Sequence, residues 1–326
     1  MLTCEHGGNL DRAISQFGGN RKEWIDLSTG INPYTYNVFD LSSDIWRELP
    51  DQQLIESTIH SAKIAYQAKS SCLPLAGVQQ AIQLLPFIIK KKTKNVCILY
   101  PSYNEYEVQF QRANWNITRC QNVDEMKHAN CAIIVNPNNP DGKKFLPNEL
   151  LELSNTVGTL IIDESFCDLY PHLSVLPHLT ERHKNIIIFR SFGKFYGLAG
   201  LRLGFVFSCE KTINEFSYTL GKWAVSGPAL AIGACALTDD SWRQQTLEKL
   251  EADAPRLDKI AQQNGLESVG GTNLFRLYQC NNAKDIQHKL AKQRIWTRIF
   301  SYSEYWIRLG LPKEDGWDRL ERAFRS

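Results

Sequence analysis

The sequence predicts an α/β protein with a mainly parallel sheet between helices and a second, smaller α/β domain. From about residue 75, short uninterrupted apolar runs such as 132–135 and 159–163 alternate with segments of helical periodicity. Strands that are apolar along their whole length are typical of a parallel sheet covered on both faces. After about residue 222 a long helical stretch is followed by short strands and helices, which indicates the second domain.

Each element follows from its local pattern. The first 30 or so residues contain two Gly-Gly pairs and predict an arm or loop. A helix over 148–156 is expected to have Asn148 as its N-cap residue. The other predicted elements are a helix at 78–89, a strand at 96–100, a helix at 104–113, strands at 132–135, 159–163, 186–189 and 203–207, a helix at 241–264, a strand at 273–278, a helix at 284–293, strands at 295–300 and 305–309, and a final helix. We expect an N-terminal arm at 1–35, a large domain at 36–222 and a small domain at 223–326.

Composition excludes several classes of function. The 326 residues include 37 Lys and Arg and 35 Asp and Glu, so the net charge of +2 gives no reason to expect a nucleic-acid partner. No apolar run approaches the ~18–20 residues that a membrane helix needs, and the N-terminus lacks the basic and apolar regions of a secretory leader. The nine cysteines are scattered without C-x-x-C spacing, which predicts reduced thiols in a cytoplasmic protein and no metal site.

The segment 191–204 holds the most informative motif. Lys194 comes three residues after Ser191 and eight before Arg202, in a glycine-rich loop between two apolar strands. A serine hydroxyl and a forked guanidinium can converge on a phosphate. A lysine beside them, in a desolvated cationic site, is readily deprotonated and can form a Schiff base. For the lysine alone, a surface side chain in a turn is the simpler reading.

With its other motifs, the chain resembles the fold-type I pyridoxal-phosphate enzymes. These motifs are Asn-Asn-Pro-Asp-Gly at 138–142 and Ile-Asp-Glu at 162–164, in the order of that superfamily. The resemblance implies a seven-stranded-type sheet and pyridoxal 5'-phosphate in the large domain, held covalently by Lys194. It implies that Asp163 pairs with the pyridine nitrogen, a partner that a carboxylate at the end of a buried strand needs. The implied cofactor contacts are Gly77, Val78, Gln79, Tyr103, Asn139, Asp163, Ser191, Lys194 and Arg202.

For most of these residues an ordinary structural role is also open. The residues 77–79 begin a helix, Tyr103 follows a strand, and Asn139 sits in a turn. Two positions depart from the superfamily pattern. Phe166 stands where many relatives have a tyrosine that donates to the ring oxygen, and Gly193 stands where they have a serine or threonine. The first departure should alter the electronics of the bound ring, and the second should loosen a phosphate contact.

Within the superfamily the chain resembles the L-threonine-O-3-phosphate decarboxylases of cobalamin biosynthesis, close kin of the histidinol-phosphate aminotransferases. His6-Gly7-Gly8-Asn9, the segment 26–33 and Gly271-Thr-Asn-Leu-Phe275 are the motifs involved. The resemblance implies decarboxylation of L-threonine O-3-phosphate to (R)-1-amino-2-propanol phosphate by a homodimer. The implied substrate contacts are His6, Gly7, Gly8, Asn9, Asn32, Arg298 and Arg308. Two arginines suit a substrate with both a carboxylate and a phosphate.

Two other functions remain open from the sequence. An aminotransferase for histidinol phosphate or another phosphorylated amine uses the same groups but breaks the Cα–H bond, and a sequence does not show a bond angle. A non-catalytic scaffold in corrinoid synthesis is disfavoured by the joint presence of Asn139, Asp163, Lys194 and Arg202. A transcription regulator is disfavoured because the chain has neither room for a DNA-binding domain nor a basic cluster.

Overall fold

The computed structural model describes residues 6–89 and 93–325, which form two compact units. The large unit comprises residues 36–139 and 143–243, and the small unit comprises the chain up to Thr35, residues 140–142 and the chain from Gln244 onward. The division at 243 falls inside helix α10 (Asp240–Gln263). The expected domains at 1–35, 36–222 and 223–326 stay a prediction. Residues 1–5, on which the expectation of no secretory leader rests, lie outside the described part.

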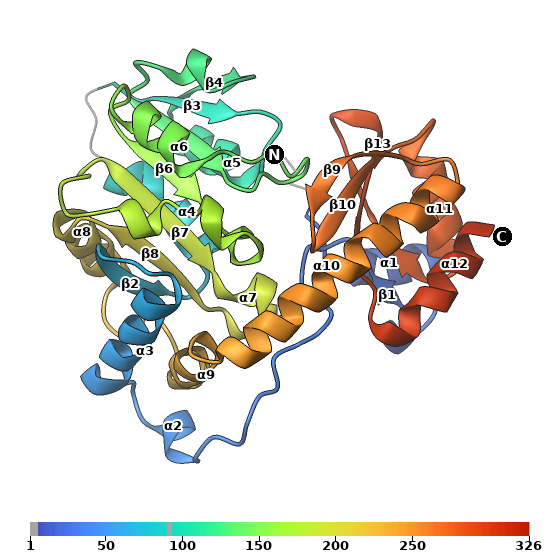
Figure 1. The fold of residues 1–326 in the computed structure, drawn as a ribbon, viewed down its shortest axis with the longest axis horizontal. Helices are drawn as coiled ribbons and strands as arrows, with labels where there is room; N and C mark the ends of the chain where they lie inside the picture. The colour runs from blue at the N-terminus through green and yellow to red at the C-terminus, as the bar shows by residue number, and fades with distance from the viewer. Residues whose placement is uncertain (1–5, 90–92, 326) are drawn as a thin grey trace. The chain divides into compact units, whose positions relative to one another are not determined.

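The large unit is built on a seven-stranded sheet with the order β2-β8-β7-β6-β5-β3-β4 (Figure 1). Strands β7, β6, β5, β3 and β4 pair in parallel, whereas β8 is antiparallel to both of its neighbours. The predicted mainly parallel sheet is therefore confirmed. The strands are β2 (Ser71–Leu75), β3 (Asn95–Leu99), β4 (Asn116–Cys120), β5 (Cys131–Val135), β6 (Leu160–Asp163), β7 (Ile186–Ser191) and β8 (Gly204–Ser208).

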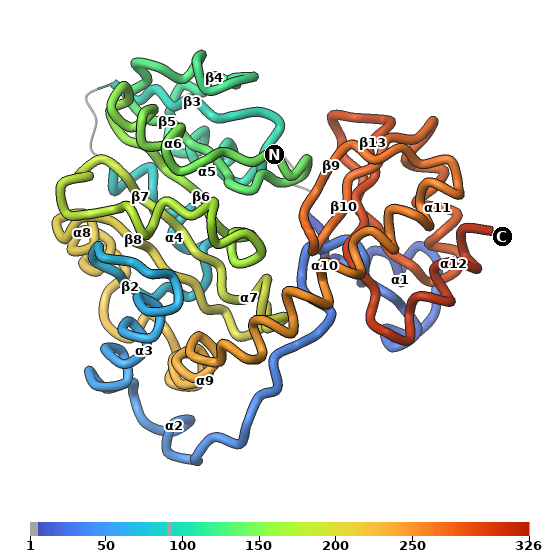
Figure 2. The backbone as a smooth tube through the Cα atoms, in the orientation of Figure 1, coloured from blue at the N-terminus to red at the C-terminus, as the bar shows by residue number. Residues whose placement is uncertain are grey.

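Helices alternate with these strands along the chain, as the trace from β3 in teal to β8 in yellow shows (Figure 2). Apolar side chains of α4, α5 and α8 form one core with alternate residues of the central strands, so these helices cover one face of the sheet. Strands β5 and β6 are buried along their whole length, which explains their uninterrupted apolar sequence. The helices are α2 (Asp44–Arg47), α3 (Gln52–Ala65), α4 (Val78–Ile88), α5 (Glu105–Arg112), α6 (Pro147–Ser154), α7 (Phe192–Phe195), α8 (Glu210–Leu220) and α9 (Gly227–Leu237).

The small unit contains two sheets. Strands β12 (Arg298–Phe300), β13 (Ser303–Gly310), β10 (Phe275–Gln279) and β9 (Glu267–Thr272) form an antiparallel sheet in that order. A second, parallel pair joins β1 (Ile25–Asp26) to β11 (Ile295–Trp296), so the start of the chain is paired with a strand near its end. Helices α11 (Ala283–Lys292) and α12 (Trp317–Arg325) belong to the same unit, together with α1 (Leu10–Phe17) and most of α10.

The expectation that the first residues form only an arm or loop is wrong. Helix α1 spans Leu10–Phe17, and the side chain of Asn9 caps it. Leu10, Ala13, Ile14 and Phe17 recur at helical spacing and pack on Trp24, Ala291 and Trp296. This short apolar stripe was present in the sequence but lies between two glycine pairs, which favoured a loop.

Most predicted boundaries agree with the structure to within a few residues. The predicted cap at Asn148 is wrong, because α6 begins at Pro147 and the backbone N–H of Leu146 donates to Glu149 at 2.6 Å. Strand β4 had no pattern to predict it, since three of its five residues are exposed or half-buried polar residues at the sheet edge. In residues 6–89 and 93–325, no helix is long and apolar enough to cross a membrane.

Candidate active site

The predicted cofactor residues of the large unit meet at one edge of its sheet. Val135 of β5 pairs with Asp163 of β6, which pairs with Phe189 of β7, so these parallel strands end together. Strand β8 runs the other way, and its first residue Gly204 pairs with both Ser191 and Leu75. This reversal brings the segment before β8 to the same edge as the segments after β2 and β7. Ligands of open α/β sheets bind at this carboxyl edge.

Gly77 and Arg202 face each other at this edge. Gly77 has φ +81° and precedes helix α4, and a Cβ on it would lie 2.5 Å from Nη2 of Arg202. Arg202 itself has a left-handed backbone (φ +55°), and its Nη1 donates to the carbonyl of Ala199 at 3.1 Å. A helix N-terminus that is capped by a glycine leaves its backbone N–H groups accessible. With a guanidinium beside it, this arrangement is suited to an anion such as phosphate.

Gly204 lets helix α4 begin against the sheet. A Cβ on Gly204 would lie 3.0 Å from the backbone nitrogen of Val78 and 3.1 Å from the carbonyl of Arg190. The first N–H groups of α4 therefore come close to the ends of β7 and β8. The sequence alone showed Gly204 only as part of a glycine-rich loop.

Asp163 is 3% exposed and accepts hydrogen bonds on both oxygens. Its Oδ1 accepts from the backbone N–H of Ser165 at 2.9 Å and from the Ser165 hydroxyl, and its Oδ2 accepts from the hydroxyl of Tyr106 at 2.8 Å. Burial raises the pKa of Asp163 above its ordinary value, although the hydrogen bonds from Ser165 and Tyr106 and the charge of Lys194 act in the opposite direction.

Lys194 lies in the short helix α7, directly after β7, and is half-buried. Its ammonium group is 5.8 Å from the centre of the Phe166 ring. The side chain at 166 is thus close to the lysine, and it provides no hydroxyl there. Lys194 and Asp163 are near enough for the lysine charge to lower the pKa of the carboxyl group.

Tyr103 and Asn139 follow the neighbouring strands β3 and β5, in loops that are hydrogen-bonded to each other. Asn138 donates to the carbonyl of Pro101 at 2.8 Å and accepts from the hydroxyl of Ser102 at 3.0 Å. The loop after β5 is therefore tied to the loop after β3. The hydroxyl of Tyr103 donates to Gln79 at 3.1 Å, so the side chain of Gln79 supports the tyrosine.

A buried ion network joins the segments that hold Asp163 and Lys194. Glu164 and Arg190 form an ion pair at 3.1 Å, and the other guanidinium nitrogen of Arg190 lies 3.1 Å from Asp168. All three side chains are at most 4% exposed. Breaking such a buried pair is costly because it leaves a charge without its partner. The network therefore fixes the end of β6 against the end of β7.

These residues fit pyridoxal phosphate. The helix start at Gly77, beside Arg202, suits the phosphate of the cofactor. The buried carboxylate of Asp163 suits a protonated ring nitrogen. Lys194 is a primary amine close enough for its charge to affect Asp163. One anion site, one buried acid and one amine at the same sheet edge are the three groups that this cofactor needs.

The predicted substrate residues all belong to the small unit, where Ser28 connects several of them. The backbone N–H of Gly8 donates to the Ser28 hydroxyl at 2.7 Å, and Arg308 donates to the Ser28 carbonyl at 2.8 Å. Gly7 is packed so closely that a Cβ would lie 2.1 Å from the same carbonyl. Arg298 on β12 pairs in register with Arg308 on β13.

A pocket of about 930 Å³ in the small unit contains three of these residues, His6, Asn9 and Arg298. Its lining also includes Arg12, Lys284 and His288. Among the described residues that line it, Glu304 is the one carboxylate. The pocket is therefore predominantly basic, which favours an anionic ligand.

The other four predicted substrate residues, Gly7, Gly8, Asn32 and Arg308, do not line this pocket. The side-chain amides of Asn9 and Asn32 already have hydrogen-bond partners within the chain. Asn9 accepts from the backbone N–H of Arg12 at 3.2 Å as a helix cap. Asn32 is 2% exposed and accepts from the backbone N–H of Tyr34 at 2.9 Å. Arg308 is 7% exposed and lies over the ring of Phe275 at 4.9 Å.

Comparison with known proteins identifies the family. The model of the family "Aminotransferase class I and II" matches residues 51–322. The chain belongs to this family. It is 39% identical over 321 residues to a threonine-phosphate decarboxylase from Sinorhizobium sp, covering 96% of this chain and 95% of that protein.

Solved structures show the same fold at low sequence identity. A histidinol-phosphate aminotransferase from Sinorhizobium meliloti, in complex with pyridoxal-5'-phosphate, has a TM-score of 0.83 and 16% identity, covering 97% of this chain and 94% of that one. The L-threonine-O-3-phosphate decarboxylase from Porphyromonas gingivalis has a TM-score of 0.75 and 16% identity, covering 92% and 98%. The predicted fold class is thereby confirmed.

In this aminotransferase-family chain, sequence reasoning missed Tyr106, Ser165 and Ser28 as contacts of the predicted site residues. Tyr106 had a local signal, since it and Phe110 are four residues apart on the buried face of α5. Ser165 lies two residues after Asp163, where the backbone N–H commonly donates to an aspartate side chain. Nothing in the sequence indicated the contacts of Ser28 beyond its place in the segment 26–33.

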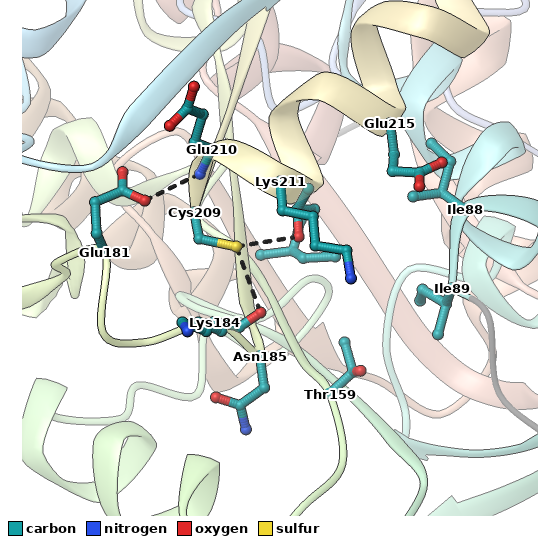
Figure 3. A pocket seen from close by; sticks show the side chains of 12 residues that line it. Ile88, Ile89, Thr159, Glu181, Lys184, Asn185, Cys209, Glu210, Lys211 and Glu215 are labelled. Carbon is teal, nitrogen blue, oxygen red and sulfur yellow. Dashed lines mark hydrogen bonds between the residues drawn. The ribbon is translucent and has the colours of Figure 1, made fainter.

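A second pocket of this aminotransferase-family chain lies at the opposite edge of the large sheet (Figure 3). Its volume is about 450 Å³, and Thr159 and Asn185 in its lining directly precede β6 and β7. Cys209 donates to the Lys184 carbonyl at 3.7 Å, and Glu181 accepts from the backbone N–H of Glu210 at 3.0 Å. None of the predicted cofactor residues, all of which are described, lines this pocket.

Proposed function

We propose that this protein is a pyridoxal-phosphate-dependent decarboxylase that converts L-threonine O-3-phosphate to (R)-1-amino-2-propanol phosphate, a reaction of cobalamin biosynthesis. The observation that carries the proposal is the 39% identity to a threonine-phosphate decarboxylase over 96% of the chain. The basic pocket with His6 and Arg298 supports a phosphorylated amino acid as substrate.

The residues of the large unit have distinct roles in this proposal. Lys194 would hold the cofactor covalently through its Nζ atom. Once the substrate amine had taken its place, the released Nζ would carry the proton that the substrate carbon needs after losing its carboxylate. Asp163 keeps the proton on the ring nitrogen. Ser191, Arg202 and the helix start at 77–79 bind the phosphate, and Tyr103 and Asn139 contact the ring. When bound, the cofactor supplies the electron sink for the pair of electrons left by the broken bond.

The residues of the small unit orient the substrate. Arg298 and Arg308 bind its two anionic groups, and His6, Gly7, Gly8, Asn9 and Asn32 form further contacts at the start of the chain. Holding the Cα–carboxylate bond perpendicular to the ring selects that bond for cleavage, because only a bond in that orientation transfers its electrons to the ring. A transaminase with the same groups presents the Cα–H bond instead.

One assay tests the reaction and its runner-up together. The cofactor-loaded protein is incubated with L-threonine O-3-phosphate, without any oxo acid. We expect CO2 and 1-amino-2-propanol phosphate in equal amounts. Conversion of the cofactor to its amine form, followed by turnover on 2-oxoglutarate, would instead establish an aminotransferase. If the protein catalysed neither decarboxylation nor transamination of phosphorylated amines, the result would favour a non-catalytic scaffold in corrinoid synthesis.

We further propose a cytoplasmic homodimer. In the large unit, Val38, Phe39, Trp46 and Leu49 are between 41% and 67% exposed. Exposed apolar side chains that gather in this way are typical of a protein–protein interface. Sedimentation of the holoenzyme should give twice the mass of 37.3 kDa, and Trp46→Glu should give a monomer. A wild-type monomer at micromolar concentration would refute the dimer.

A further inference from the structure

We propose that Tyr106 is a positioning residue that orients the carboxylate of Asp163 toward the cofactor ring nitrogen and keeps the proton on that nitrogen. The inference rests on the proposed role of Asp163. Three donors already reach this carboxylate.

The hydrogen bonds of the described residues leave Asp163 with one acceptor position for a ligand. Each carboxylate oxygen accepts about two hydrogen bonds. The backbone N–H and the hydroxyl of Ser165 both donate to Oδ1, and the Tyr106 hydroxyl donates to Oδ2 at 2.8 Å. The remaining position is therefore on Oδ2, the oxygen that Tyr106 already contacts.

Tyr106 is held firmly enough to set the direction of that position. Its side chain is fully buried on α5, and its ring meets the ring of Tyr103 edge-on, with 6.3 Å between the ring centres. Tyr103 is the predicted stacking partner of the cofactor ring. One side chain thus contacts both the predicted partner of the ring nitrogen and the predicted partner of the ring face.

The phenol of Tyr106 is a permanent donor. Burial, followed by the charge of Asp163, raises its pKa well above the ordinary value, so it keeps its proton at every working pH. A donor on Oδ2 makes the carboxylate less basic, and burial acts in the opposite direction. Asp163 and the ring nitrogen compete for one proton. Tyr106 therefore shifts that proton toward the nitrogen.

The small unit provides a matched control. Tyr278 is also fully buried, and its hydroxyl donates to the carboxylate of Asp258 at 2.8 Å. Tyr278→Phe and Tyr106→Phe each remove one hydrogen bond from a buried tyrosine to an aspartate, although Asp258 is itself 30% exposed. Neither Tyr278 nor Asp258 is among the predicted cofactor residues.

The experiment measures the ring nitrogen directly. Holoenzyme is prepared with pyridoxal phosphate labelled with ¹⁵N in the ring, and the ¹⁵N chemical shift and the cofactor Kd are measured for wild type, Tyr106→Phe, Tyr278→Phe and Asp163→Asn. We expect Tyr106→Phe to move the resonance part of the way toward the unprotonated position and to weaken cofactor binding about tenfold, as expected for one hydrogen bond to a charged group. Tyr278→Phe should leave both quantities at their wild-type values.

The outcomes separate this inference from the proposed function. If Tyr106→Phe matches Tyr278→Phe while Asp163→Asn shifts the resonance, Tyr106 has no positioning role and the role of Asp163 stands. If Asp163→Asn also leaves the resonance unchanged, the role of Asp163 is wrong. Should Tyr106→Phe fail to fold, 3-fluorotyrosine at position 106 provides a stronger donor of nearly the same shape, and the resonance should move further toward the protonated position. An unchanged resonance would then overturn the inference.

Discussion

A methyl group on Gly77 would lie 2.5 Å from the Nη2 atom of Arg202. The two residues come from segments more than 120 positions apart in the sequence, and they meet because β2 and β8 pair with Leu75 opposite Gly204. A glycine at the start of α4 thus leaves room for the guanidinium and for the phosphate that we propose it binds.

Gly77→Ala should weaken cofactor binding by about tenfold or more, because the methyl group displaces Arg202 and costs a charge-assisted hydrogen bond. It should also destabilise the protein by roughly 1–3 kcal/mol, the cost of an L-residue in a backbone conformation (φ +81°, ψ 153°) that essentially only glycine adopts. Gly221→Ala is the matched control, with φ +75° and nothing within 4 Å of a Cβ. We expect a similar loss of stability there, measured by urea unfolding, and an unchanged cofactor Kd. Equal cofactor Kd values for the two variants would contradict the proposal that the space beside Gly77 is needed for phosphate binding.

Lys194→Ala should abolish covalent attachment of the cofactor. The wild-type holoenzyme should be yellow. After borohydride treatment and denaturation it should still carry the cofactor as a covalent label, because the reduced C–N bond is stable. The variant should retain none. Lys211→Ala, whose lysine lines the pocket of Figure 3, should behave as wild type. Full labelling of Lys194→Ala would show that another amine binds the cofactor.

Asp163→Asn should change the pH dependence of stability in the cofactor-free protein. Burial raises the pKa of Asp163 in the folded state above the ordinary value of 3.8. Between these two pKa values the folded protein binds more protons than the unfolded chain, so the contribution of Asp163 to stability falls as pH rises. The variant lacks this loss. Its free energy of unfolding, relative to wild type, should increase with pH through that window and then remain constant. A relative stability that decreased with pH would mean that the folded pKa is depressed.

Ser28→Ala should loosen the start of the chain. The variant loses both hydrogen bonds of the Ser28 hydroxyl, the one it accepts from the backbone N–H of Gly8 and the one it donates to Asp26. The Ser28 carbonyl can still accept from Arg308. A net loss of about 1 kcal/mol corresponds to an approximately fivefold rise in KM for the phosphorylated substrate. We expect a smaller change in kcat, because the cofactor residues are untouched. Ser268→Ala, at an exposed position of β9, is the control. A fall in kcat at constant KM would assign Ser28 to the chemical step instead.

Much of the order of strands and helices from residue 75 onward was predictable, because β5, β6 and β8 are buried along their whole length and read as apolar runs. The edge strand β4 and the helices α8 and α9 were not predicted. The first helix was missed because its apolar stripe is short and becomes meaningful only against Trp24 and Trp296. Tyr106 and Ser28 were missed because a hydroxyl in a sequence does not show which distant group it contacts.

The sequence by itself determined the parallel sheet, the family and the identity of the predicted acid, amine and cation at 163, 194 and 202. Only the tertiary structure decided how these groups are arranged. The reversed direction of β8 brings Arg202 to Gly77, and α5 places the Tyr106 hydroxyl on Asp163. Local patterns determine which segments are buried, but the contacts that tune a buried charge come from segments that only folding brings together.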